Sequence, residues 1–102
     1  MQFEEWCSQE GFIEKAEKCA KEFINQMKLL DIKMFLNIFE NFNMENVQYQ
    51  FHSASYVINY NKQKEKNYSI KVCIECDDFP LANYIANFNL DGTLIEEYLL
   101  ID

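Results

Sequence analysis

The fold is decided by residues 68–102, which read YSIKVCIECDDFPLANYIANFNLDGTLIEEYLLID. Apolar and polar side chains alternate from Tyr68 to Cys76, which is the period-two pattern of a strand with one buried face. Two further segments of strand type follow, separated by polar turns around Asp77 and Asp91. This third of the chain therefore predicts three consecutive strands.

Two turns are expected to join these strands. The first is Asp77-Asp78-Phe79-Pro80, where we expect the proline to end the ladder of backbone hydrogen bonds. The second is Asp91-Gly92, because a type I′ hairpin needs positive φ at both central residues and these two residue types tolerate it. If these two residues form the whole loop, the expected cross-strand pairs are Phe88 with Ile95, Asn87 with Glu96, Tyr84 with Leu99 and Asn83 with Leu100.

The residues before this stretch predict two helices. Apolar side chains recur at helical spacing from Phe12 to Leu30, and charged ones, including the i, i+4 pair of Glu17 and Lys21, fall on the other side. Asp31 is a candidate N-cap for a second, shorter helix that is rich in phenylalanine. We expect these phenylalanines to pack between helix and sheet, and a ligand pocket lined by them is the alternative.

From Val47 to Tyr60 the period changes to two, which predicts strand structure before the polar loop at residues 61–67. A chain of 102 residues has the size of one domain. The expected fold class is therefore α+β, with two N-terminal helices packed on a curved antiparallel β-meander of four to five strands.

The charge balance bears on the kind of partner. The net charge is −8, and all nine basic residues are lysines. Arginine is the residue that best recognises phosphate and guanine, so we expect no binding to nucleic acid or to a membrane surface. A basic protein is the natural electrostatic complement, although the charge could also serve solubility alone.

Several residue types that often carry chemistry are present but poorly arranged. Cys73 and Cys76 form a Cys-x-x-Cys, yet a spacing of three on a strand sends the two side chains to opposite faces. His52 is the only histidine and lies on the polar phase of its strand. We therefore expect no catalytic residue, no metal and no cofactor.

The compartment is inferred from what the sequence does not display. Neither a secretory signal nor an apolar stretch of membrane-spanning length is evident, so we expect a cytoplasmic protein. In that compartment the four cysteines are expected to be free thiols.

The acids are distributed unevenly. From Val72 to Asp102 there are seven acids and no lysine, so this segment carries almost the whole net charge. Aromatic anchors ringed by polar groups are typical of protein interfaces. We therefore predict a partner-binding surface made of Glu75, Asp77, Asp78, Phe79, Asp91, Glu96, Glu97 and Tyr98. A solvated, charged sheet without a partner is the alternative.

Two helices that lead into a meander with the closing hairpin Asn87–Tyr98 resemble the cystatin-like α+β fold of the nuclear transport factor two superfamily. The similarity covers about residues 12 to 102. It implies a cone between helices and sheet, where enzymes of the superfamily hold an acid or histidine dyad. No inward acid is expected in this sequence.

Small size, acidity and the lack of a reactive constellation also resemble the immunity proteins of bacterial contact-dependent inhibition and polymorphic toxin systems. Such proteins bind and neutralise a toxin domain, commonly a basic nuclease. The resemblance implies a non-enzymatic inhibitor. One alternative is a small-molecule pocket protein or enzyme of the cystatin-like superfamily, and another is a module that self-associates through an edge of the meander.

Overall fold

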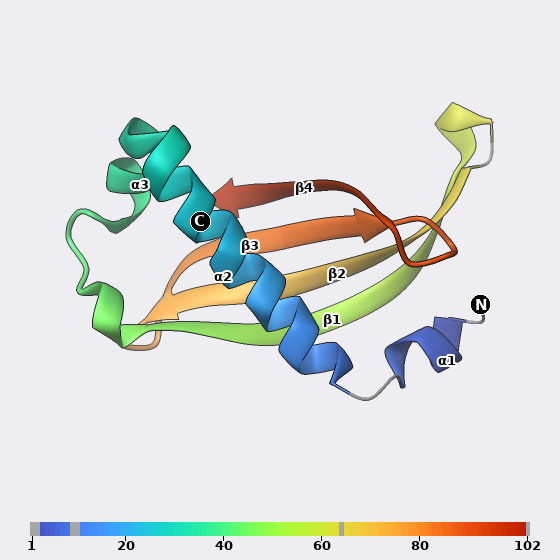
Figure 1. The fold of residues 1–102 in the computed structure, drawn as a ribbon, viewed down its shortest axis with the longest axis horizontal. Helices are drawn as coiled ribbons and strands as arrows, with labels where there is room; N and C mark the ends of the chain where they lie inside the picture. Colours follow the sequence, from blue (N-terminus) through green and yellow to red (C-terminus); the bar gives the residue numbers. More distant parts are fainter. Residues whose placement is uncertain (1–2, 9–10, 64, 102) are drawn as a thin grey trace.

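The computed structural model describes residues 3–8, 11–63 and 65–101. Within them four strands form one antiparallel sheet in the order β1-β2-β3-β4, and the helices lie against one face of it (Figure 1). The elements in chain order are α1 (Phe3–Cys7), α2 (Phe12–Leu30), α3 (Ile32–Phe39), η1 (Met44–Asn46), β1 (Val47–Asn59), η2 (Tyr60–Lys62), β2 (Glu65–Cys76), β3 (Phe79–Phe88) and β4 (Leu94–Ile101). The predicted α+β class with an antiparallel meander is confirmed.

The two predicted helices are α2 and α3. The side chain of Asp31 accepts a hydrogen bond from the Met34 N–H at 3.2 Å, so the predicted N-cap of α3 is confirmed. The predicted buried stripe of α2 was wrong at its end, because Leu30 is 85% exposed. The stripe runs instead through Ile24 and Met27, together with Ala16 and Ala20, whose small side chains let the helix lie close to the sheet.

β1 is one long strand with a β-bulge between Phe51 and Ser53. On either side of it, Phe51 pairs with Val72 and Ala54 pairs with Ile70, so the inward face is kept while His52 becomes the extra residue. The interruption of the apolar pattern near Ser53 therefore marks a bulge inside one strand.

The turn between β2 and β3 differs from the prediction. Cys76 pairs with Phe79, so the loop consists of Asp77 and Asp78, with φ of 51° and 66°. Positive φ at both central residues is the property of a type I′ hairpin, and aspartate is among the residues that tolerate it. The prediction that Pro80 ends the ladder was wrong. Pro80 pairs with Glu75 inside β3, beside a register shift, where a missing N–H is tolerated.

The loop between β3 and β4 also differs, because it spans residues 89–93 and not Asp91-Gly92 alone. Asn89 Oδ1 accepts hydrogen bonds from the N–H groups of Asp91 and Thr93, and Asp91 Oδ1 accepts from the N–H and hydroxyl of Thr93. The longer loop shifts one pair, so Phe88 lies opposite Leu94. The other predicted pairs are confirmed: Asn87 with Glu96, Tyr84 with Leu99, and Asn83 with Leu100.

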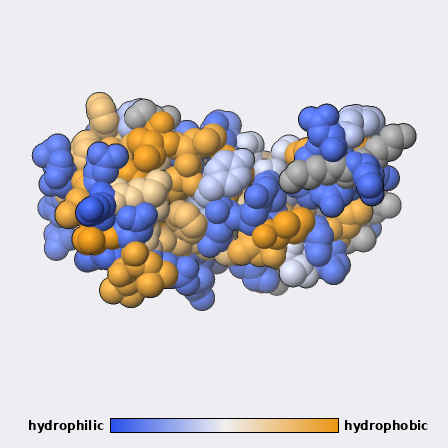
Figure 2. Space-filling model, turned by 90° about the horizontal axis from the view of Figure 1, so that it is seen from above, coloured by the Kyte–Doolittle hydropathy of each residue, from blue (hydrophilic) through white to orange (hydrophobic). Residues whose placement is uncertain are grey.

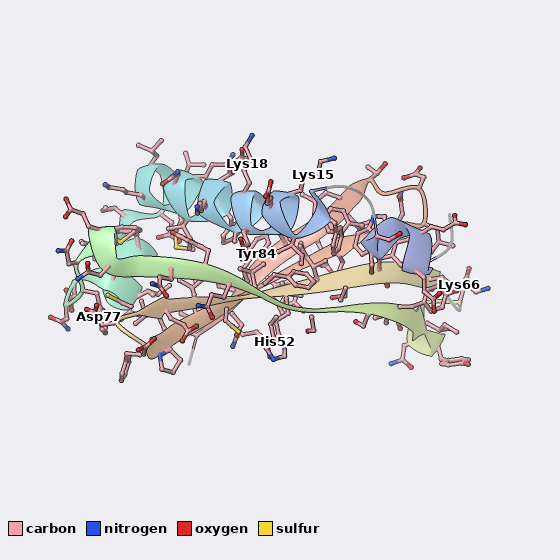
Figure 3. The ribbon with its side chains drawn as sticks, turned by 90° about the horizontal axis from the view of Figure 1, so that it is seen from below. Lys15, Lys18, His52, Lys66, Asp77 and Tyr84 are labelled. Carbon is pink, nitrogen blue, oxygen red and sulfur yellow. The ribbon has the colours of Figure 1, made fainter. Side chains whose placement is uncertain are left out.

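The core lies between the helices and the inward face of β2 and β3, which present Tyr68, Ile70, Val72, Ile74 and Tyr84. Each of the three aliphatic side chains among them contributes about 1.5–3 kcal/mol by burial. The short helix α1 closes one end of this core through Trp6, whose ring stacks on Tyr68 with centroids 4.6 Å apart. No helix of the described chain covers the opposite, outer face of the sheet (Figure 3).

Candidate functional site

The predicted partner-binding residues fall in four places, of which the tip of the β2–β3 hairpin holds the most. Asp77, Asp78 and Phe79 project there, next to the half-buried Glu75. Phe79 is 58% exposed, and its ring stacks on Phe42 with centroids 5.7 Å apart. We name this group, Glu75 with Asp77–Phe79, the acidic tip.

The acidic tip is fixed to the loop that follows α3. Asn46 Nδ2 donates a hydrogen bond to Asp77 Oδ2 at 3.4 Å, which brings η1 beside the tip. Glu45 of η1 therefore adds a carboxylate at this end of the molecule, a residue missed from the sequence because it lies 32 positions before Asp77. Figure 3 places Asp77 at the opposite end from Lys66.

The other predicted residues are separated from the acidic tip. Asp91 lies in the loop between β3 and β4, where hydrogen bonds from Thr93 lower the pKa of its carboxyl group. Glu96 and Tyr98 face outward on β4, and Asn87 Nδ2 donates to Glu96 Oε1 at 2.9 Å. The predicted set therefore does not form one continuous site.

Glu97 points toward the helices, so the expectation of no inward acid was wrong. The Tyr84 hydroxyl donates to Glu97 Oε2 at 2.6 Å. Burial, followed by this hydrogen bond, raises the pKa of Tyr84 far above its usual range, so the phenol stays a donor. Burial and the carboxylates of Glu22 and Glu97 raise the pKa of Cys19. The signal was present in the alternation, because Glu97 shares its face with Leu99.

A cavity of about 290 Å³ lies between α1, α2 and the sheet, beside the loop at residues 89–93. Trp6, Phe12, Ile70 and Phe88 supply its aromatic and aliphatic walls, and Lys15, Cys19 and Asp91 supply polar groups. Its volume is at the lower limit for small-molecule sites. Neither Tyr84 nor Glu97 lines it.

No arrangement for metal binding was found among the described residues, which contain no group of three or more His, Cys, Asp or Glu side chains able to hold an ion. Cys76 is buried and Cys73 lies on the outer face, so the two thiols diverge as predicted. His52 is exposed, and its Nδ1 lies 2.9 Å from the hydroxyl oxygen of Ser53. No described helix is long and apolar enough to cross a membrane.

The charges of the acidic tip are not neutralised locally. In the described part of the chain the one ion pair within 4.0 Å joins Lys18 and Glu22, both on α2. The predicted pair of Glu17 and Lys21 does not form, because Glu17 Oε2 accepts the N–H of Phe51 on β1 at 2.9 Å. The lysine nearest the tip on β2, Lys71, pairs across the sheet with Ile85 in the middle of the strand.

Comparisons with known proteins return no relative. No family model matches the chain, and neither the curated proteins nor the solved structures contain a significant match. The resemblance to cystatin-like folds therefore stays a prediction.

Proposed function

We propose that this protein is a non-enzymatic inhibitor of the immunity-protein type, which acts in the cytoplasm by binding a basic protein partner. The observation that carries this proposal is the acidic tip. There, Glu75, Asp77 and Asp78 are close along the chain to Phe79, whose ring is exposed, and none of these carboxylates forms an ion pair with a lysine of the described structure.

The geometry of the tip suits recognition because it is held in place before binding. A two-residue hairpin fixes the two aspartates, and stacking on Phe42 fixes the ring of Phe79. An aromatic anchor that is already ordered loses little conformational entropy on binding. The carboxylates of the acidic tip would steer a basic partner toward it and make association faster at low salt.

The remaining predicted residues have different roles in this proposal. Glu96 and Tyr98 would contact only a partner that extends from the tip over the outer face. Asp91 and Glu97 would act through the overall negative field, since Asp91 lies at the far end of β3 and Glu97 bonds to Tyr84.

The test is affinity capture from the native cell with variants that remove charge without disturbing the turn. Asp77→Asn combined with Asp78→Asn keeps residue types that tolerate positive φ. A matched control is Glu4→Gln with Glu5→Gln on α1, which removes the same charge from another exposed site.

We expect wild type and the α1 control to retain the same basic protein, and the tip variant to lose it. Binding should also weaken as salt is raised. Equal retention by the tip variant and the wild type would refute the proposed surface.

A second candidate function is that of a small-molecule pocket protein, and the cavity beside Trp6 favours it. A thermal-shift screen of small aromatic and amphipathic metabolites would test this candidate. Stabilisation that disappears in Cys19→Phe, which would narrow the cavity from a half-buried position of its wall, would support it. Stabilisation that survives this substitution would place the ligand elsewhere.

A further inference from the structure

The β4 edge of the sheet is open and apolar. Ile95 is 58% and Leu100 is 52% exposed, and Leu94, Tyr98 and Ile101 are also exposed. Residues 94–101 contain no lysine and no proline, which are two of the usual devices that keep an edge strand from pairing. The register shift of this strand leaves Ile95 as an extra residue near its start, and residues 96–101 pair regularly with β3. Figure 2 looks toward this edge and shows apolar side chains gathered at the end where β4 finishes and α3 lies.

The opposite edge, β1, also exposes apolar side chains at Tyr56 and Ile58, but it is better protected against pairing. β1 is interrupted by its bulge, and Gln48, Gln50 and Ser55 are exposed on its outer face. Glu17 accepts the Phe51 N–H at the bulge. A regular stretch of edge strand without such protection, such as residues 96–101 of β4, is a template for another strand.

The sequence of β4 is complementary to itself in one antiparallel register. In a two-fold pair across this edge, one residue lies opposite its own copy, and side chains on the same face meet. If Glu97 took that central position, two carboxylates would face each other, which is unfavourable. If Tyr98 takes it, the facing pairs within the regular part of the strand are Tyr98 with Tyr98, Glu97 with Leu99, and Glu96 with Leu100.

We propose that two copies of this chain pair through β4 with Tyr98 on the two-fold axis. The axis is perpendicular to the sheet, so the two sheets become one and both helical layers lie on the same face. Most of the strand takes part in this register, and no acid faces an acid. Registers centred nearer either end of β4 would leave more of the strand unpaired.

The inference is independent of the proposed inhibitor function. Edge pairing uses backbone groups, so the side chains of Glu96 and Tyr98 stay on the outer face and the acidic tip stays free. The two associations also differ in their response to salt. Each copy carries a net charge of −8, so salt should strengthen the pairing of two copies and weaken the binding of a basic partner.

The first test is sedimentation analysis with light scattering over a concentration series at low and high salt. We expect the wild type to approach about twice the 12.2 kDa mass of one chain, at lower concentration when salt is high. Tyr98→Glu should lose the dimer, because two carboxylates would meet at the axis. The matched control Tyr60→Glu, in η2, makes the same change of charge at an exposed tyrosine and should still dimerise.

A wild type that stays at 12.2 kDa under all these conditions would overturn the proposal and assign the open edge to a different protein. A Tyr98→Glu variant that still dimerises like the control would overturn the register.

The second test determines the register by disulfide cross-linking, in a variant that adds no charge to the strand. Facing Cα atoms in antiparallel pairs are about 4.5–5.5 Å apart, which is within the range that a disulfide spans. Tyr98→Cys should therefore give a covalent dimer under mild oxidation. Glu96→Cys, on the same face, should give no more than the wild type with its four native thiols. Equal cross-linking of the two variants would refute the proposed axis.

Discussion

β1 and β4 are the two edge strands of one sheet, and each leaves backbone groups without a neighbouring strand. β1 is shielded by a bulge, by polar outward residues and by Glu17, which reaches from α2 to the Phe51 N–H. Lys21 adds to this cover, with its ammonium group 5.7 Å from the centroid of the Tyr49 ring. The bulge of β4 lies near the start of the strand, at Ile95, so residues 96–101 stay regular, and the exposed residues of this strand are mostly apolar.

The difference shows that protection of a sheet edge depends on where the helices lie. α2 crosses the sheet obliquely, so its charged side chains reach β1 at the bulge, whereas α3 lies near only one end of β4 (Figure 1). At β1, the bulge and the hydrogen bond to Glu17 interrupt the edge, which opposes pairing with another strand. The β4 edge is available for pairing, and the sequence of β4 can pair with a second copy of itself without placing an acid opposite an acid.

The largest expected effect comes from removing the cover of β1. Glu17→Ala leaves the part-buried Phe51 N–H without its acceptor, which should lower the free energy of unfolding by about 1–3 kcal/mol. Glu17→Gln keeps an acceptor and should restore most of the loss. Chemical denaturation measures all three proteins. Glu14→Ala, at an exposed position of the same helix, is the control, and an equal loss there would contradict the role given to Glu17.

A smaller effect is expected at the hydrogen bond between Tyr84 and Glu97, which ties the inward face of β4 to β3 and which we call the inner anchor of β4. Tyr84→Phe removes the donor to Glu97, which should cost about 1 kcal/mol of unfolding free energy because the half-buried carboxylate can be partly rehydrated. The amides of β4 should then exchange hydrogen faster, while those of β1 stay unchanged. Uniform acceleration in both edge strands would mean that this bond stabilises the whole core and not β4 in particular.

Alkaline pH should weaken the same anchor. The pKa of Tyr84 is raised in the folded protein, so above the usual tyrosine pKa of about 10 the unfolded chain loses this proton while the folded chain keeps it. The stability contributed by Tyr84 is therefore fully present below that pH and declines as pH rises further. Denaturation curves should show a shallower decline in Tyr84→Phe, with Tyr49 and Tyr68, whose pKa values burial also raises, accounting for the remainder. Identical pH profiles would argue against the buried phenol.

The smallest change in stability is expected when β4 is given the protection that it lacks. Leu100→Lys places a charge on an exposed position of the edge strand, so the unfolding free energy should change by no more than about 0.5 kcal/mol. Self-association should nevertheless be lost, because lysines on edge strands oppose pairing. Sedimentation of this variant beside Ile13→Lys, an exposed apolar position on α2, would separate an edge effect from a general effect of charge.

Much of the fold could be predicted from the sequence, because local periodicity determines it. The boundaries of α2, the N-cap at Asp31 and most β3–β4 pairs are consequences of spacing or capping chemistry within a few residues. The lengths of the two turns were predicted the wrong way round: the two-residue loop was expected at Asp91-Gly92, and the longer one at residues 77–80. The shorter loop formed at Asp77 and Asp78 because Pro80 fits beside a register shift, and that compatibility depends on the neighbouring strand.

The candidate site was less predictable, because it depends on contacts between distant segments. The approach of η1 to Asp77, the stacking of Phe42 on Phe79 and the capture of the Phe51 N–H by Glu17 all join residues more than thirty positions apart. Glu97 is different. Its inward position follows from the alternation in β4, but its charge suggested an outward role.

Hydrogen exchange measured at low and high protein concentration tests the contrast between the edges most directly. Raising the concentration should slow exchange of those β4 amides that do not bond to β3, with the strongest effect around Tyr98, and should leave β1 unchanged. Concentration-independent exchange in β4, or equal slowing in β1 and β4, would contradict the conclusion that β1 is protected against pairing and that β4 pairs with a second copy.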